Sequence, residues 1–158
     1  MLEDSTEMFV ARWRSAAAQV ELFARTEGSP LLEARAGEIV LQLFERSGPY
    51  LSRPGPARVI INPTVESVEL TEALPKPSLE VAGVSRIDAV GPVLELDGNH
   101  LLLDAGVPLV VGSSSPLPPG LSAGSWVRIS SIAPVHAFVV TEDGRTGRRR
   151  EQSADDAL

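Results

Sequence analysis

Apolar residues near the start of the chain recur at helical spacing. Between residues 5 and 27 they follow one another at steps of four and three, which places them on one face of a helix. The members of this stripe are Phe9, Trp13, Ala16, Val20 and Phe23. Ser5 or Asp4 can cap this helix at its start, and Gly28 can end it because glycine readily takes a positive φ.

A second stretch with helical spacing follows at once. Ser29 and Pro30 are typical of a helix start, with serine as the cap and proline in the first turn. The apolar stripe that follows consists of Leu32, Ala36, Ile39 and Leu43. Because so short a break separates the two segments, the pattern predicts an antiparallel helical hairpin over residues 1–48. We expect its aromatic residues to be core, and a coiled-coil-like seam between two copies is the alternative.

After residue 58 the pattern changes to short apolar runs separated by turn residues. Prolines make residues 49–58 a stiff connector. Residues 64–74 fit neither the helical nor the strand period cleanly, and we favour a strand. From Leu79 onward the strand pattern is clearer, and Asp97-Gly98-Asn99 predicts a tight hairpin. A run of short strands without intervening helices indicates a small antiparallel barrel over residues 59–141.

The last part of this region suggests a type of barrel. A loop rich in Ser, Pro and Gly, residues 112–124, is followed by Gly124-Ser125-Trp126-Val127-Arg128-Ile129. This pattern resembles the fourth strand of an OB-fold. We therefore predict an α+β protein: an N-terminal helical hairpin, then an OB-like antiparallel β-barrel, with an SH3-like barrel or a sandwich as alternatives. Residues 142–158 lack an apolar pattern and are expected to be a disordered tail.

Composition excludes several kinds of chemistry. The 158 residues include no cysteine, which rules out a disulfide scaffold, a thiol nucleophile and a thiolate zinc site. Neither glycine-rich phosphate-binding motif occurs, and we expect no cofactor. The net charge is −7 and the acidic residues are spread along the chain, which disfavours binding to phosphate backbones. The acidic start and the absence of a long apolar run predict a cytoplasmic protein without membrane contact.

Two patterns could carry chemistry, and the sequence favours a plainer role for each. Gly120-Leu121-Ser122-Ala123-Gly124 matches the nucleophile elbow of hydrolases, but prolines precede it and a predicted strand follows it. Asp97, His100 and Asp104 could ligate a metal, yet they do not make a closed site. We predict a loop serine, turn aspartates and an edge histidine, with no metal site and no enzymatic activity.

The remaining features favour a binding protein. We expect a non-catalytic binding or adaptor module that contacts a partner protein, or itself, through the helical hairpin, the barrel groove or the 112–124 loop. The candidate binding residues are Trp13, Phe23, Arg86, His100, Trp126, Arg128 and His136. The alternative is a single-stranded nucleic-acid-binding protein, in which Arg86 and Arg128 act with the arginine-rich tail.

Overall fold

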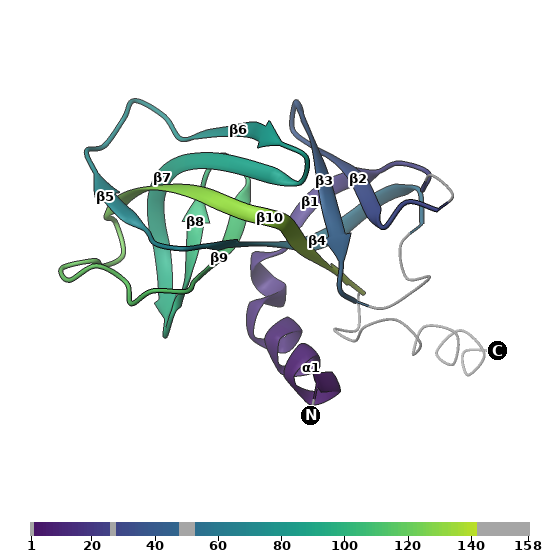
Figure 1. Cartoon of the computed structure of the whole chain (residues 1–158), viewed down its shortest axis with the longest axis horizontal. Helices are drawn as coiled ribbons and strands as arrows, with labels where there is room; N and C mark the ends of the chain where they lie inside the picture. The colour runs from purple at the N-terminus through teal and green to yellow at the C-terminus, as the bar shows by residue number, and fades with distance from the viewer. Residues whose placement is uncertain (1, 26–27, 48–52, 142–158) are drawn as a thin grey trace.

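The computed structural model describes residues 2–25, 28–47 and 53–141, and most of them are in strands (Figure 1). The helical elements of this part of the chain are α1 (Leu2–Trp13) and the 3-10 turn η1 (Arg14–Ala16). The strands of the first half are β1 (Ala18–Leu22), β2 (Leu31–Ala36), β3 (Ile39–Glu45), β4 (Gly55–Val65) and β5 (Glu69–Thr71). Those of the second half are β6 (Ser78–Gly83), β7 (Arg86–Asp97), β8 (His100–Asp104), β9 (Pro108–Ser113) and β10 (Trp126–Val140).

Eight of these strands close into a barrel, so the protein is mostly β. The order around the wall is β4, β9, β8, β7, β10, β3, β2, β1 and back to β4. β4 and β10 also pair with each other through the middle, from Arg58 with Val140 to Val65 with Ser131. This antiparallel pair therefore belongs to two closed rings at once, one on either side of it (Figure 1). β5 and β6 extend the wall, β5 along β10 and β6 along β7.

The two rings repeat the same connectivity. β1, β2 and β3 form an antiparallel meander, and β7, β8 and β9 form another. β1 pairs antiparallel with β4 in the way that β7 pairs with β10. β3 lies parallel to β10 in the way that β9 lies parallel to β4. The described strands therefore contain one unit twice, related by a two-fold operation that exchanges β4 and β10.

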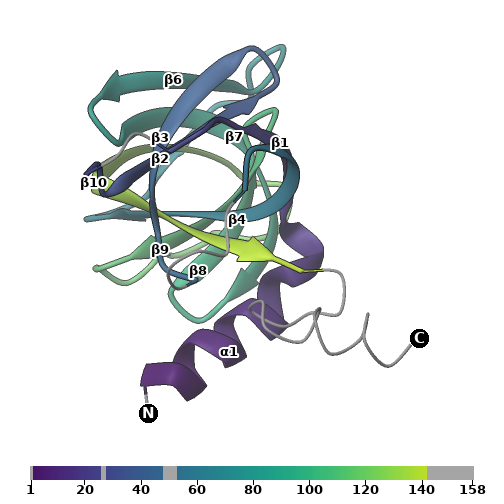
Figure 2. The ribbon, with the colours of Figure 1, turned by 90° about the vertical axis from the view of Figure 1, so that its right-hand side faces the viewer.

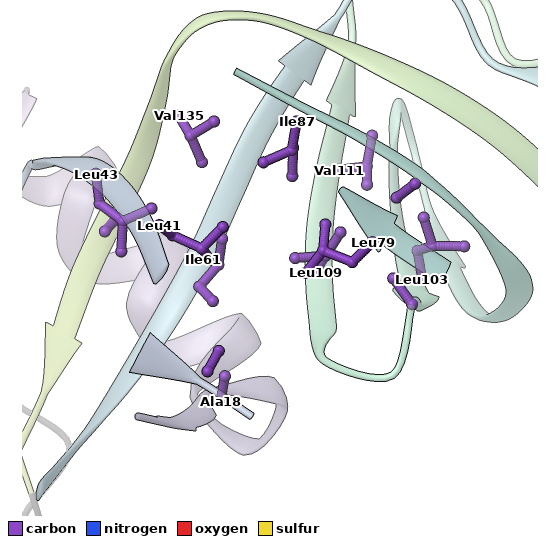
Figure 3. Close-up of a cluster of buried hydrophobic side chains, with 14 of the residues drawn as sticks. Ala18, Leu41, Leu43, Ile61, Leu79, Ile87, Leu103, Leu109, Val111 and Val135 are labelled. Atoms are coloured by element: carbon purple, nitrogen blue, oxygen red, sulfur yellow. The ribbon is translucent and has the colours of Figure 1, made fainter. Parts of the chain in front are cut away.

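The inward side chains of both rings form one core (Figure 3). β2 shows how alternation builds it: Leu32, Ala34 and Ala36 are buried, whereas Glu33 and Arg35 are exposed. Since successive side chains of a strand point to opposite faces, one face of each strand can be apolar throughout. Figure 3 shows Leu43 and Ile61 from the first half of the chain in the same cluster as Leu103 and Leu109 from the second.

Helix α1 lies outside the barrel and covers part of its outer face (Figure 2). Val10 and Trp13 of the helix are 1% and 3% exposed. The barrel residues in this second apolar cluster are Ile60, Val110, Phe138 and Val140, with Leu102 beside them. At the edge of the contact, Arg12 donates from Nε to Asp97 at 2.6 Å and from Nη2 to Glu95 at 2.5 Å. The helix is thus fixed to both β7 and the outer face of β4 and β10.

The expected helical hairpin over residues 1–48 is wrong, because only its first part is helical. α1 ends at Trp13, and the rest of the predicted hairpin forms β1, β2 and β3. A step of four residues, as from Leu32 to Ala36, returns to the same face of a strand as well as of a helix, so spacing alone could not separate the two. Gly37, with φ of 64°, makes the turn between β2 and β3. Ser29 accepts a hydrogen bond from the backbone N–H of Leu31 in a turn and caps no helix.

Other expectations agree with the structure in whole or in part. The hairpin at Asp97-Gly98-Asn99 is confirmed, with Gly98 at φ of 62° between β7 and β8. The strand interpretation of residues 64–74 holds for the end of β4 and for β5. Of the predicted connector, residues 49–52 lie outside the described residues and the last positions belong to β4. The predicted tail, residues 142–158, also lies outside them.

The loop expected over residues 112–124 is present between β9 and β10, although its first two positions belong to β9. Its Leu117 and Leu121 pack against the main core. Two hydrogen bonds connect the end of the loop to β7. The backbone N–H of Gly124 donates to the carbonyl oxygen of Val93, and the N–H of Val93 donates to that of Ser125, each at 2.7 Å. The loop therefore covers one end of the barrel and is tied to β7.

Gly91 of β7 gives the first test of this packing. A Cβ at this position would lie 1.9 Å from the backbone carbonyl oxygen of Asp104. We expect Gly91→Ala to lower the free energy of unfolding by about 3 kcal/mol, because the backbone must move to admit the methyl group. Urea denaturation measures the loss. The control is Gly83→Ala, where the nearest atoms are 3.7 Å away in a flexible arginine side chain and the change should stay within about 0.5 kcal/mol. Equal losses in the two variants would contradict the close approach.

Trp13 gives a second test, of the contact between α1 and the barrel. We expect Trp13→Ala to lower the free energy of unfolding by about 3–5 kcal/mol, because it removes the largest buried side chain of the helix. Met8 is on the same helix and 71% exposed, so Met8→Ala should change stability by no more than about 0.5 kcal/mol. Urea denaturation followed by circular dichroism compares the two variants. A loss below about 1 kcal/mol for Trp13→Ala would show that the helix does not hold this position.

Candidate functional site

A cleft lies on the outer surface where β10 passes between the start of β7 and the segment that follows β4. Its volume is about 470 Å³. The residues that line it include Arg86, Arg128, Glu66, Glu69, Ser130 and Ile132. It brings together Arg86 and Arg128, the two arginines named as candidate binding residues from the sequence.

Strand alternation explains why polar side chains gather there. In β10, Val127 and Ile129 point into the core, so Arg128 and Ser130 point outward. Arg128 lies opposite Glu69 of β5 on one side and Val90 of β7 on the other. This part of the outer face therefore carries side chains of both charges beside an apolar residue.

The two arginines are available to a ligand. Within residues 2–25, 28–47 and 53–141, neither guanidinium makes an ion pair or a hydrogen bond to another residue, and both side chains are exposed. A guanidinium binds a carboxylate or a phosphate through two parallel hydrogen bonds. Glu66 and Glu69 on the opposite side of the cleft make it suitable for a ligand that carries both kinds of charge, and unsuitable for a uniform polyanion.

Two of the other candidate residues belong to the contact between α1 and the barrel. The ring centroids of Trp13 and His100 are 6.4 Å apart, and those of Phe9 and His100 are 5.5 Å apart. Arg12 lies over the Trp13 ring at 4.0 Å. Trp13 and His100 are therefore brought together, but by the internal packing of the protein.

The remaining candidates lie at separate places. Trp126 begins β10, lies opposite Pro92, and points to the same face as Arg128. Phe23 follows β1 and is partly exposed, and its backbone N–H bonds to the carbonyl oxygen of Glu33. Neither lines the cleft.

His136 lies in the middle of the pair formed by β4 and β10, opposite Asn62. Its ring meets that of Phe44 edge-on at 5.9 Å, and Nη1 of Arg46 lies 3.4 Å from its Nδ1. The pKa of His136 is lowered from 6.5, first by burial and then by the charge of Arg46. The pKa of His100 is also lowered by burial, and the charge of Asp97 opposes that effect.

Of the two patterns that could carry chemistry, Ser122 lies in a loop and Asp104 lies in a turn. Ser122 lies in an irregular loop, where its backbone N–H donates to Oγ of Ser125, and no strand-to-helix turn presents it. Asp104 accepts a bond from the backbone N–H of Gly106, which is the role of a turn residue. In the described ranges, no group of three or more His, Asp or Glu side chains is arranged to hold a metal ion.

Comparison of the chain with protein-family models, curated proteins and solved structures finds no match. The helical segments in the described part of the chain are too short to cross a bilayer. Function must therefore be argued from the residues of the site. Glu66 and Glu69 could not be recognised as site residues from the sequence, because their segment fits neither period and nothing local places it beside β10.

The lowered pKa values of the two histidines predict a loss of stability in mild acid. The unfolded chain takes up protons near the ordinary value of 6.5, whereas the folded chain takes them up only at lower pH. Above about pH 6.5, the two histidines should therefore make the free energy of unfolding neither rise nor fall with pH. Below that pH, the free energy of unfolding should decrease as the pH falls, until the histidines of the folded protein are protonated.

Urea unfolding between about pH 7.5 and 5.5 measures this effect. A variant with His100→Gln and His136→Gln should show a shallower fall than the native chain over this range. Stability that rises as the pH decreases in this range would contradict the direction of the pKa shifts.

Proposed function

We propose that this protein is a non-catalytic binding module for another protein, and that the cleft around Arg86 and Arg128 holds an acidic segment of that partner. The observation that carries the proposal is the pair of exposed guanidiniums without partners in the described part of the chain. A guanidinium can hold a carboxylate through two parallel hydrogen bonds, and a cleft with a few convergent polar groups is a candidate for ligand binding.

The chemistry of the cleft favours a polypeptide as the ligand. Each arginine can hold one carboxylate bidentately, while Glu66 and Glu69 can accept hydrogen bonds from backbone N–H groups or basic side chains. Ile132, which is 42% exposed, adds an apolar contact at the same place. A short polypeptide segment with acidic and apolar residues could bind the arginines through its carboxylates, the glutamates through its backbone N–H groups and Ile132 through an apolar side chain.

We also propose that each ring is OB-like. Each contains a three-strand meander closed by the long strands β4 and β10, and OB-folds are small Greek-key barrels that bind ligands on the face of their second and third strands. In the second ring that face is formed by β8 and β9, and α1 already lies on it. In this ring, the contact with α1 therefore counts against the usual OB-fold face as the ligand site.

Single-stranded nucleic acid is the second candidate ligand. Trp126 and Arg128 are neighbours on one face of β10, and an aromatic ring beside a cation is typical of a stacking site. Acidic side chains at Glu66, Glu69 and Asp88 interrupt this face, which opposes a phosphate backbone. For this reason we place the nucleic-acid function second.

The experiment selects peptides from a random display library on the immobilised full chain. We expect the enriched peptides to contain Asp or Glu beside apolar residues. Binding of a synthetic enriched peptide should weaken by about tenfold or more when Arg86 and Arg128 are both replaced by glutamate, since each substitution replaces an attraction by a repulsion.

Arg35→Glu is the matched control. It changes the charge in the same direction at an exposed position on β2, outside the cleft, and should leave peptide binding unchanged. Peptides without acidic residues, or equal binding by the variants, would contradict the proposal. Binding of a labelled single-stranded oligonucleotide that falls steeply with salt and is lost with the two arginines would favour the second candidate.

A further inference from the structure

A continuous row of side chains crosses the outer face of the barrel from β2 to β8. Its members in order are Leu31, Phe44, His136, Asn62, Val110 and Leu102. The middle of the row is the pair His136 and Asn62, and Asn62 donates a hydrogen bond to the carbonyl oxygen of Val110 at 2.7 Å. The two-fold relation between the rings exchanges the two halves of this row, so that Phe44 corresponds to Val110.

The two halves of the row differ in what covers them. Helix α1 covers the half with Val110, which is 0% exposed, together with Ile60 and Phe138. We call the other half, consisting of Leu31, Phe44 and His136, the open half. Its side chains are all partly exposed, and no helix in the described residues lies over it. Val40, four residues before Phe44 on the same strand, lies outside the open half and is 44% exposed.

We propose that the open half of the row is a second docking face and that its occupant is an amphipathic helix of a partner protein. The contact with α1 supports this choice, because it shows what the equivalent surface of the same fold holds: a helix that places Phe9, Val10 and Trp13 on the strands. The proposal concerns a surface other than the arginine cleft and does not depend on the function proposed for that cleft.

The charges around the open half indicate which charge the bound helix should carry. Beside the covered half, Glu95 and Asp97 of the barrel form ion pairs with Arg12 of the helix. On the open half, the exposed Arg46 lies beside His136 instead. A helix that binds there should therefore carry an acidic residue where α1 carries Arg12, with an apolar and aromatic stripe like that of α1.

A second copy of this chain is a poorer occupant. Its only described α-helix buries Val10 and Trp13 against its own barrel, and that burial would be lost if the helix moved to another molecule. The helix also carries Arg12, which would face Arg46.

The test titrates the full chain, labelled with ¹⁵N, with a synthetic peptide of residues 1–16 in which Arg12 is replaced by glutamate. We expect amide shift changes at Leu31, Phe44 and His136, and not in α1. Phe44→Asp should weaken binding of this peptide by about tenfold or more, because it puts a carboxylate at the centre of the apolar contact. Val40→Asp, the same charge change elsewhere on the same strand, should leave it unchanged.

Each other outcome would overturn the proposal. Absence of shift changes at millimolar peptide shows that the open half takes no helix of this chemistry, and tighter binding of the unmodified Arg12 peptide shows that the assigned charge is wrong. A dimer in sedimentation that Phe44→Asp dissociates assigns the surface to a second copy. Tighter peptide binding after removal of residues 143–158 assigns it to the chain's own C-terminal segment. Replacement of Arg86 and Arg128 by glutamate should change neither the amide shifts nor the peptide affinity nor the sedimentation.

Discussion

The pairing of β4 with β10 is the interaction on which the rest of the structure depends. Each strand is part of both rings, so neither meander can close without the pair. Residues 59–61 of β4 are buried on both faces of the sheet. Val59 and Ile61 point into the core, Ile60 lies under α1, and all three are 0% exposed. A strand covered on both sides has a continuous apolar run, which is what Val59-Ile60-Ile61 provides. The two rings are therefore joined through the residues of the β4–β10 pair.

This arrangement determines where a ligand can bind. The core uses the inner faces of the strands, and α1 uses one half of the outer row. The outer surfaces that stay uncovered include the cleft along β10 and the open half beside Phe44. In both places the structure leaves charged side chains pointing to solvent next to apolar ones, Arg128 beside Ile132 and Arg46 beside Phe44. Such combinations are typical of protein-binding surfaces, in which an apolar centre is bordered by polar groups.

The sequence predicted the second half of the fold better than the first. From Leu79 onward, turn residues such as Gly98 are unambiguous, and alternation gives the faces of the strands. In the first half, Ala34 and Ala36 are good helix formers in a strand, and a spacing of four suits both structures, so pairing with distant strands overrode local preference. Arg86 and Arg128 were selected as residues, but their meeting in one cleft depends on the register of β7 and β10, which no local pattern reveals.

The most direct test of the proposed binding function is photo-crosslinking from the cleft in cells that make the protein. A photoreactive amino acid at Ser130, which lines the cleft, should form an adduct with one protein, at an acidic segment, and the adduct should survive nuclease treatment. The same residue at Arg35, outside the cleft, should not form it. Adducts that contain nucleic acid, or adducts that are the same from both positions, would contradict the assignment of the cleft as a protein-binding site.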